Sequence, residues 1–394
     1  MPANASLWLM VLLAAIVAIT PFAVDTYLPA MPVIAKDLHT HIGIVQQSLS
    51  IFLAAYGAGM LVFGPLADKL GRRPLALFGV SGFAISTLFI ALTTTIEGFL
   101  IGRALQAFCG AAATVIVPGI IRHLYQEHTA KGMSLMSLIM MLAPLLAPAI
   151  GSGILMVSQW QTIFWLIFSY AILMLFFIWK YLPEFKNPVA PSKITFLSSY
   201  VTVFANADAR PLILTAMFSS FSFFCYLTAV PFVYIEYFGI SAQLFSFLFA
   251  VNILLLMLSS FINSRFVTRV GSPRMARYAL IAAFVLAILL CIVNIMHLNI
   301  WFTVLALAPL MGCLTMITTN TDAMIILKFP NHSGTASAVT GTLRYGCGAL
   351  AGPALALSFT GTAVPFSVLM FAGILGMGAC QIWIARRKQA KPLT

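Results

Sequence analysis

Four ionisable side chains stand inside long apolar runs of this chain, and each of them needs a chemical reason to be there. They are Asp25, Arg103, Asp322 and Arg344. Insertion scales put the cost of such a residue in a membrane span at about 2.5–3.5 kcal/mol, so these residues typically mark ion pairs, proton relays or ligand sites. We therefore take them as the first candidates for function.

Asp25 and Arg103 lie at similar depths, toward the outer ends of the first and fourth apolar runs. One hypothesis makes Asp25 the proton-coupling carboxylate, with Arg103 as the cation that keeps it ionised until substrate or conformation separates them. The same residues also suit a structural ion pair, or an Asp25 that caps its span at the interface. The residue types leave both interpretations open.

Arg344 lies near the middle of the eleventh run, and Asp322 lies on the tenth at a depth where the two can meet. In one interpretation Arg344 lines a cavity for an anionic or carbonyl-bearing substrate. In the other, the two residues form a buried lock between neighbouring helices. Both remain open at this point.

The apolar runs that carry these residues predict a polytopic membrane protein. Apolar residue types make up 61% of the 394 residues and charged types only 8%, which excludes a soluble globular domain. Runs of about 18 or more nearly uncharged residues predict twelve membrane spans. The predicted spans are 6–28, 43–64, 75–95, 99–121, 132–155, 161–182, 211–235, 242–264, 276–296, 300–327, 333–358 and 363–385.

A long polar interruption divides these spans into six and six. We predict an all-α membrane protein with an N-terminal six-helix bundle over 1–183, a cytoplasmic linker over 184–210 and a C-terminal six-helix bundle over 211–394. The two halves begin and turn alike. Pro21-Phe22 precedes Asp25 as Pro231-Phe232 precedes Glu236, and Leu70-Gly71 corresponds to Val270-Gly271.

The net charge of +12 follows the topology and does not indicate a nucleic-acid surface. With both termini in the cytoplasm, 18 of the 21 basic residues fall in cytoplasmic segments and only Lys36 falls in an outer loop, as the positive-inside rule requires. All six cysteines lie within spans, so neither a disulfide framework nor a metal site is predicted. The sequence has no phosphate-binding loop of the Gly-x-x-x-x-Gly-Lys-Ser/Thr type, so ATP is not expected as the direct driver.

The segment from Gly64 to Pro74 resembles the signature loop of the major facilitator superfamily of secondary transporters. Within that superfamily the chain is most similar to the drug/proton antiporter branch and its Bcr/CflA group. The residues that carry this resemblance are Asp25-Thr26-Tyr27-Leu28-Pro29, Arg103-Ala104-Leu105-Gln106, Pro231 to Glu236 and Gly334 to Ala338. The group's antiporter motif Gly-Pro-x-x-Gly-Gly appears here as Ala147-Pro148-Ala149-Ile150-Gly151-Ser152, which keeps only Pro148 and Gly151 of its conserved types. Asp322 and Arg344 stand where the group usually has uncharged residues.

The resemblance implies a proton-coupled transporter of the bacterial inner membrane that exports small amphiphilic molecules by alternating access, as a monomer with no cofactor beyond the proton gradient. It implies that the loop braces the two bundles, although a simple topology anchor would also explain its arginines. The loop residues concerned are Gly64, Asp68, Gly71, Arg72 and Arg73. Polar residues on the spans that line the family's cavity are candidate substrate ligands beside Asp322 and Arg344, namely Tyr27, Tyr226, Asn252 and Asn320.

The aromatic-rich seventh span suits a flat ligand, although most of its phenylalanines are expected to face lipid or neighbouring helices. An alternative keeps the fold and moves an anionic metabolite or a polycarboxylate siderophore, in either direction. A remote alternative is an intramembrane enzyme, for which the sequence offers neither a metal cluster nor a Ser/Lys pair at depth.

Overall fold

A computed structural model describes residues 7–125, 136, 140, 142–184, 205–329 and 333–390 of the chain. Nearly all of these residues are helical, because a backbone in a membrane must satisfy its polar groups within its own helix. The predicted all-α membrane fold is confirmed. Residues 185–204 of the predicted linker, and most of the first turns of the predicted fifth span, lie outside the described residues.

The described helices follow the predicted spans. Ten of them are long and apolar enough to cross a membrane, and Leu142–Val157 is a shorter apolar helix that occupies the fifth predicted span. The helices of the first half are α1 (Leu7–Asp25), α2 (Met31–Asp37), α3 (Ile42–Leu70), α4 (Arg72–Leu92), α5 (Ile96–Tyr125), α7 (Leu142–Val157) and α8 (Gln161–Tyr181). Those of the second half are α10 (Arg210–Pro231), α11 (Ala242–Val270), α12 (Ser272–Ile295), α13 (Ile300–Lys328), α14 (Ser333–Ala349), α15 (Ala351–Leu357) and α16 (Val364–Ala390).

The chain separates into two compact units. Within the described residues, the first unit contains α1 to α8 together with Ser241–Ala250, and the second contains α10 and the chain from Val251 onward. The sequence assigned residues 241–250 to the second bundle. They cluster with the first because the start of α11 contacts α7, where the Ser246 hydroxyl donates a hydrogen bond of 2.8 Å to the carbonyl of Pro148.

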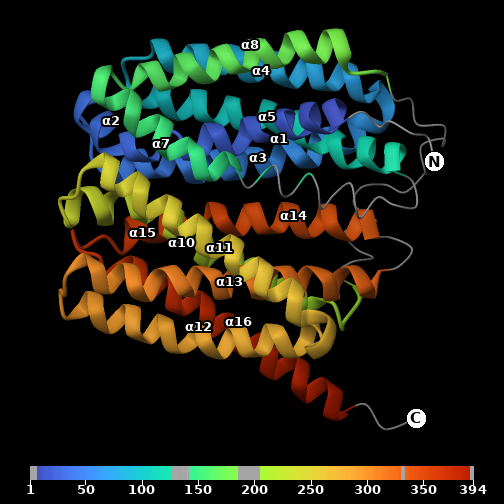
Figure 1. The fold of residues 1–394 in the computed structure, drawn as a ribbon, viewed down its shortest axis with the longest axis vertical. Helices are drawn as coiled ribbons and strands as arrows, with labels where there is room; N and C mark the ends of the chain where they lie inside the picture. Colours follow the sequence, from blue (N-terminus) through green and yellow to red (C-terminus); the bar gives the residue numbers. More distant parts are fainter. Residues whose placement is uncertain are drawn as a thin grey trace. The chain divides into compact units, whose positions relative to one another are not determined.

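Each unit is a set of helices packed along their lengths. In the first unit α4 lies between α5 and α8, and α3 packs on α5 (Figure 1). In the second unit α12 packs against α13 and α16, while α10 packs against α13, α14 and α16. The pairs α10–α13 and α10–α14 matter most below, because they bring three polar helix faces together.

Two glycine turns sit at the same step of each half. Gly71 joins α3 to α4 with φ +89°, and Gly271 joins α11 to α12 with φ +84°. These left-handed values suit glycine because a Cβ there would be strained. The predicted hairpin over 64–74 is much shorter in the structure, because α3 continues to Leu70 and only Gly71 lies between the helices.

Three predicted spans depart from a regular α-helix near a proline. The first ends at Asp25 and continues through a short 3-10 turn, Leu28–Ala30, into α2. The eleventh is divided at Leu350 into α14 and α15, because the ring of Pro353 clashes with the carbonyl four residues earlier, that of Ala349, where α14 ends. The seventh span ends in a π-helical turn, Phe232–Tyr237, directly after Pro231.

Candidate functional site

A cavity of about 360 Å³ lies within the second unit, between α10, α13 and α14. Its size falls in the range of small-molecule binding sites. Its wall combines hydroxyl groups, aromatic rings and one arginine. The lining residues are Ser219, Ser220, Phe223 and Phe224 of α10, Leu314, Thr315, Thr318 and Thr319 of α13, and Gly341, Arg344 and Tyr345 of α14.

Arg344 is the charged residue of this wall. Its Nη1 atom lies 2.9 Å from Oδ2 of Asp322, and its Nε atom donates a hydrogen bond of 3.0 Å to the Ser220 hydroxyl. About a third of each charged side chain is exposed, 30% for Arg344 and 36% for Asp322. The predicted meeting of Arg344 and Asp322 is therefore present, and Arg344 also faces a cavity. The two sequence interpretations of this pair are not exclusive.

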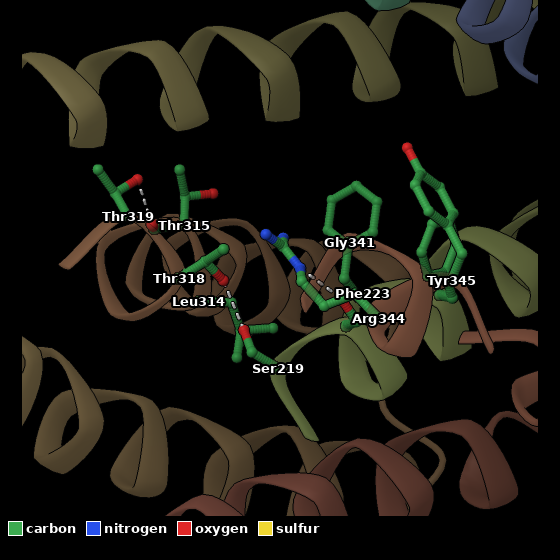
Figure 2. Close-up of a pocket in the computed structure, with 11 residues that line it drawn as sticks. Ser219, Phe223, Leu314, Thr315, Thr318, Thr319, Gly341, Arg344 and Tyr345 are labelled. Carbon is green, nitrogen blue, oxygen red and sulfur yellow. Dashed lines mark hydrogen bonds between the residues drawn. The ribbon is translucent and has the colours of Figure 1, made fainter. Parts of the chain in front are cut away.

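The aromatic part of the wall is held by close packing of α10 on α14. A Cβ added at Gly348 would lie 2.3 Å from the Phe224 ring, so the ring occupies the space that a side chain would need. Phe224 in turn lies 6.1 Å from Tyr345 and 5.3 Å from Phe223, measured between ring centroids. In Figure 2 the side chains of Arg344 and Tyr345 both extend toward the top of the view, among the residues that line the cavity.

The hydroxyl part of the wall comes from both α10 and α13. Ser219 and Thr318 share a hydrogen bond of 2.7 Å across the two helices, drawn as a dashed line in Figure 2. The hydroxyls of Thr315 and Thr319 each donate to the carbonyl four residues earlier in α13. Their oxygen atoms keep lone pairs, so a ligand donor can still bind there.

Three predicted substrate ligands of the second unit lie elsewhere. Asn252 donates a hydrogen bond of 2.7 Å to the Tyr226 hydroxyl, and Asn320 donates one of 2.6 Å to Asn263, all among buried side chains. They join α11 to α10 and to α13, and they are not among the residues that line the cavity. Their role as substrate ligands stays a prediction.

Arg103 of the first unit lies in a different environment. Its side chain is completely buried, with its guanidinium carbon 4.3 Å from the ring centroid of Tyr27 and 4.4 Å from that of Phe52. Two aromatic faces are favourable neighbours for a planar cation that has left water. Nη1 donates 3.1 Å to the carbonyl of Ala23 and 2.6 Å to Gln106.

These contacts explain the spacing of the Arg103-Ala104-Leu105-Gln106 motif. Residues three apart face the same side of a helix, so Gln106 can accept from Arg103 while its own amide donates to Thr87 of α4 at 2.7 Å. Thr87 continues the chain to the carbonyl of Phe83. The motif therefore joins α1, α5 and α4 through one line of buried hydrogen bonds.

The expected pairing of Asp25 with Arg103 is not present in this structure. Asp25 is buried, with 5% exposure, and no hydrogen bond or ion pair reaches its carboxylate from the described residues. Arg103 contacts the backbone of α1 at Ala23 instead. Positions 23 and 25 lie about 200° apart around a helix, so the side of α1 that meets Arg103 is not the side that carries the carboxylate. The proton-coupling role of the two residues stays a prediction.

Tyr27 also belongs to this packed region. Its ring is fully buried under Arg103 and its hydroxyl lies 3.0 Å from that of Ser48. As a substrate ligand it would have to become accessible, and that prediction is likewise untested.

The other predicted functional residues of the first unit are mostly placed. Arg73 donates to the carbonyl of Trp179 at the end of α8, next to the turn at Gly71. Arg72 begins α4 and Gly64 lies within α3; the side chain of Asp68 lies outside the described residues. A brace between the bundles stays a prediction.

The antiporter motif makes a close contact with α1. A Cβ added at Gly151 would lie 1.9 Å from the carbonyl oxygen of Thr26, whereas one at Gly153 would meet nothing within 4 Å. The small residue at 151 thus allows α7 to touch the chain directly after Asp25, as the retained motif glycine predicts.

Sequence reasoning missed several residues of the cavity wall. Phe223 and Phe224 were assigned to lipid or helix packing, yet both line the cavity. The threonines of α13 were not considered. Their spacing at 315, 318 and 319 places three hydroxyls on one helix face, which is the signal that would have found them.

Comparison with known proteins gives consistent matches. The family model described as Major Facilitator Superfamily matches residues 13–353. A bicyclomycin resistance protein homolog from Haemophilus influenzae is 32% identical over 366 residues, covering 92% of this chain and 90% of that protein. A chloramphenicol resistance protein from Pseudomonas aeruginosa is 28% identical over 307 residues, covering 73% of this chain and 70% of that protein.

Among solved structures, a crystal structure of the nucleoside transporter NupG superposes with a TM-score of 0.76 at 13% identity. The match covers 97% of this chain and 99% of that one. At this identity the likeness concerns the fold.

Proposed function

The chain belongs to the Major Facilitator Superfamily of membrane transporters, as a Bcr/CflA-like member of its multidrug-resistance relatives, and from this premise we propose that it is a proton-coupled exporter of small amphiphilic drugs. Transport proceeds by alternating access of a site near the middle of the membrane. The observation that carries the proposal is the full-length similarity to a bicyclomycin resistance protein homolog. The mixed polar and aromatic cavity beside Arg344 supports it, because it suits uncharged, ring-bearing molecules such as chloramphenicol.

Asp25 is the proposed proton carrier. It is buried at the end of α1, and no cation contacts it among the described residues. A carboxyl group in such a place is expensive to ionise, so a rearrangement that admits water or a cation to it would release a proton. Arg103, fixed by Ala23 and Gln106, holds a second charge close to the same helix end and is the group that such a rearrangement would expose to Asp25.

We place the protein in the bacterial inner membrane as a monomer, with both termini in the cytoplasm. The asymmetry of its basic residues supports this orientation, since 18 of 21 fall on one side. The proton gradient supplies the free energy and no cofactor is required.

A second candidate cargo is an anionic metabolite or a polycarboxylate siderophore. The observation in its favour is the guanidinium of Arg344 in the cavity wall, because a planar cation binds carboxylates well. The ion pair with Asp322 opposes it, since the carboxylate already compensates the arginine.

Purified protein in vesicles tests the leading proposal. An acidic interior should drive accumulation of radiolabelled chloramphenicol, since protons leave as the drug enters. Asp25→Asn should abolish this accumulation while exchange of chloramphenicol across the vesicle at equal pH continues. Glu236→Gln is the matched control, because it makes the same chemical change at the exposed acid that corresponds to Asp25 in the second half.

Two outcomes would contradict the proposal. Accumulation by the wild type that ignores the pH gradient would exclude proton coupling. Undiminished gradient-driven accumulation by Asp25→Asn would exclude Asp25 as the carrier.

A further inference from the structure

The guanidinium of Arg344 is only partly engaged by its neighbours. Nε donates to Ser220 and Nη1 to Asp322, and Nη2 makes no hydrogen bond to the described residues. Arg344 lines the cavity, whereas Asp322 does not. The cavity therefore faces the open donor edge of the arginine, while the carboxylate that compensates its charge lies outside the wall.

We propose that Asp322 sets the charge selectivity of this cavity, so that it binds uncharged, ring-bearing molecules with a carbonyl or nitro acceptor and discriminates against free carboxylates and lipophilic cations. The proposal rests on the proposed function, in that it takes this cavity as a cargo site. It assigns the choice between charged and uncharged ligands to the ion pair of Asp322 and Arg344, two positions where the Bcr/CflA group usually has uncharged residues.

The electrostatic argument compares three kinds of ligand. A lone arginine in an apolar wall would attract a carboxylate strongly, because the attraction is weakly screened there. Asp322, 2.9 Å from the Nη1 atom, cancels most of that attraction. A cation meets the positive end of the pair and is repelled. An uncharged acceptor keeps the hydrogen bond to Nη2 and loses nothing to the carboxylate.

The remaining wall fits the same class of ligand. The rings of Phe223, Phe224 and Tyr345 offer apolar faces to a flat group. The hydroxyls of Thr315 and Thr319 can accept from a ligand hydroxyl or amide. No second full charge lines the cavity among the described residues, so Arg344 and Asp322 together decide its charge.

Equilibrium binding to the purified full chain in lipid nanodiscs tests the proposal with three probes. Chloramphenicol is an uncharged nitroaromatic, its hemisuccinate ester adds one carboxylate on a succinyl chain at a side-chain hydroxyl, and tetraphenylphosphonium is a cation. Wild type should bind chloramphenicol more tightly than either ion. Asp322→Asn should raise the affinity for the hemisuccinate by roughly tenfold to a hundredfold, as expected for an uncompensated charge at this distance.

Arg344→Gln tests the opposite charge. It leaves Asp322 uncompensated, so it should improve tetraphenylphosphonium binding and weaken chloramphenicol binding by roughly tenfold through the lost donor. The double variant Asp322→Asn/Arg344→Gln restores neutrality, so neither ion should gain while chloramphenicol still binds weakly.

The outcomes are distinguishable. Wild type that binds none of the three probes overturns the proposed function together with this inference. Wild type that binds chloramphenicol, while Asp322→Asn folds and leaves hemisuccinate binding unchanged, overturns the charge selectivity alone. If Asp322→Asn does not fold, Arg344→Gln decides, and unchanged tetraphenylphosphonium binding by that variant overturns the inference.

Discussion

The two halves of this transporter each hold an arginine inside the membrane, and the two are held in opposite ways. Arg103 is fully buried between two aromatic rings, with a glutamine and a backbone carbonyl as acceptors. Its Nε and Nη2 atoms have no hydrogen-bond partner among the described residues. Arg344 is partly exposed in a cavity wall and paired with Asp322. The same residue type is thus packed out of reach in one half and faces a ligand-sized space in the other.

The difference teaches how to interpret a charge in a membrane span. A carboxylate partner is often assumed to be what makes such a charge tolerable. Arg103 shows that aromatic faces and buried amides can take that place, whereas Arg344 has the carboxylate and yet is the more accessible of the two. Accessibility, rather than pairing, separates the candidate ligand Arg344 from Arg103, which is closed off by packing in this structure.

Removing each arginine is the strongest way to break the comparison. Arg103→Ala should lower the free energy of unfolding by about 2–5 kcal/mol, because it empties a packed site and leaves Gln106 without its donor. Arg344→Ala should cost less, about 1–3 kcal/mol, because Arg344 is partly exposed although its loss leaves Asp322 without its partner. Thermal unfolding of the purified variants in one detergent measures both. Equal losses would mean that Arg344 is structural after all.

Disrupting the contact of α7 with α1 near Asp25 should give the next largest loss of stability. Gly151→Ala should cost about 1–3 kcal/mol, because its Cβ would overlap the Thr26 carbonyl and force α7 away from α1. Gly153→Ala in the same helix, and Gly346→Ala in the arginine-bearing α14, have open space for a Cβ and should leave stability unchanged or slightly higher. The same unfolding assay applies. A tolerated Gly151→Ala would show that the first half is less tightly packed than Arg103 suggests.

Removing an acceptor of Arg103 should cost more stability than removing an acceptor of Arg344. Gln106→Leu leaves a fully buried guanidinium without an acceptor, at a cost of about 1–3 kcal/mol. Ser220→Ala frees only the Nε atom of a partly exposed side chain and should cost less than about 1 kcal/mol, while weakening chloramphenicol binding because Arg344 is less well held. Unfolding and nanodisc binding together sharpen the contrast. A larger stability loss for Ser220→Ala than for Gln106→Leu would reverse it.

A last effect on stability should be the same in both halves. Gly71→Ala and Gly271→Ala each impose a side chain on a left-handed backbone, at a cost of about 1–2 kcal/mol. At Gly71 the new methyl would also meet the carboxylate of Glu184, whose flexible end can move aside. Clearly unequal losses would show that only one of the two turns is under backbone constraint.

The sequence predicted the positions of the helices well, because the length of an apolar run gives the length of a membrane span directly. It located the meeting of Arg344 and Asp322 for a similar reason, since depth in the membrane can be counted along each span. It failed for Asp25 and Arg103 because depth does not give rotation about the helix axis. The side of α1 that meets Arg103 depends on how α1, α3 and α5 pack, and residue positions along the chain do not give that packing.

The cavity was the least predictable feature. Phe223 and Phe224 are residue types that commonly face lipid, yet both line the cavity, and the Phe224 ring fills the space beside Gly348 of α14. The threonine face of α13 was available as a pattern but carried no sign of which neighbour it would meet. The place of these residues in the cavity wall follows only from the packing of α10, α13 and α14.

The paired turns at Gly71 and Gly271 also bear on how natural and laboratory variation should be interpreted. No cargo touches these positions in the proposed scheme, yet nearly every replacement there would be penalised by the backbone alone. In a saturation mutagenesis survey of drug resistance they would score beside true cargo contacts. The distinguishing mark would be uniformity: every drug would be lost in the same proportion, whereas a change in the wall near Arg344 should reorder the resistance profile.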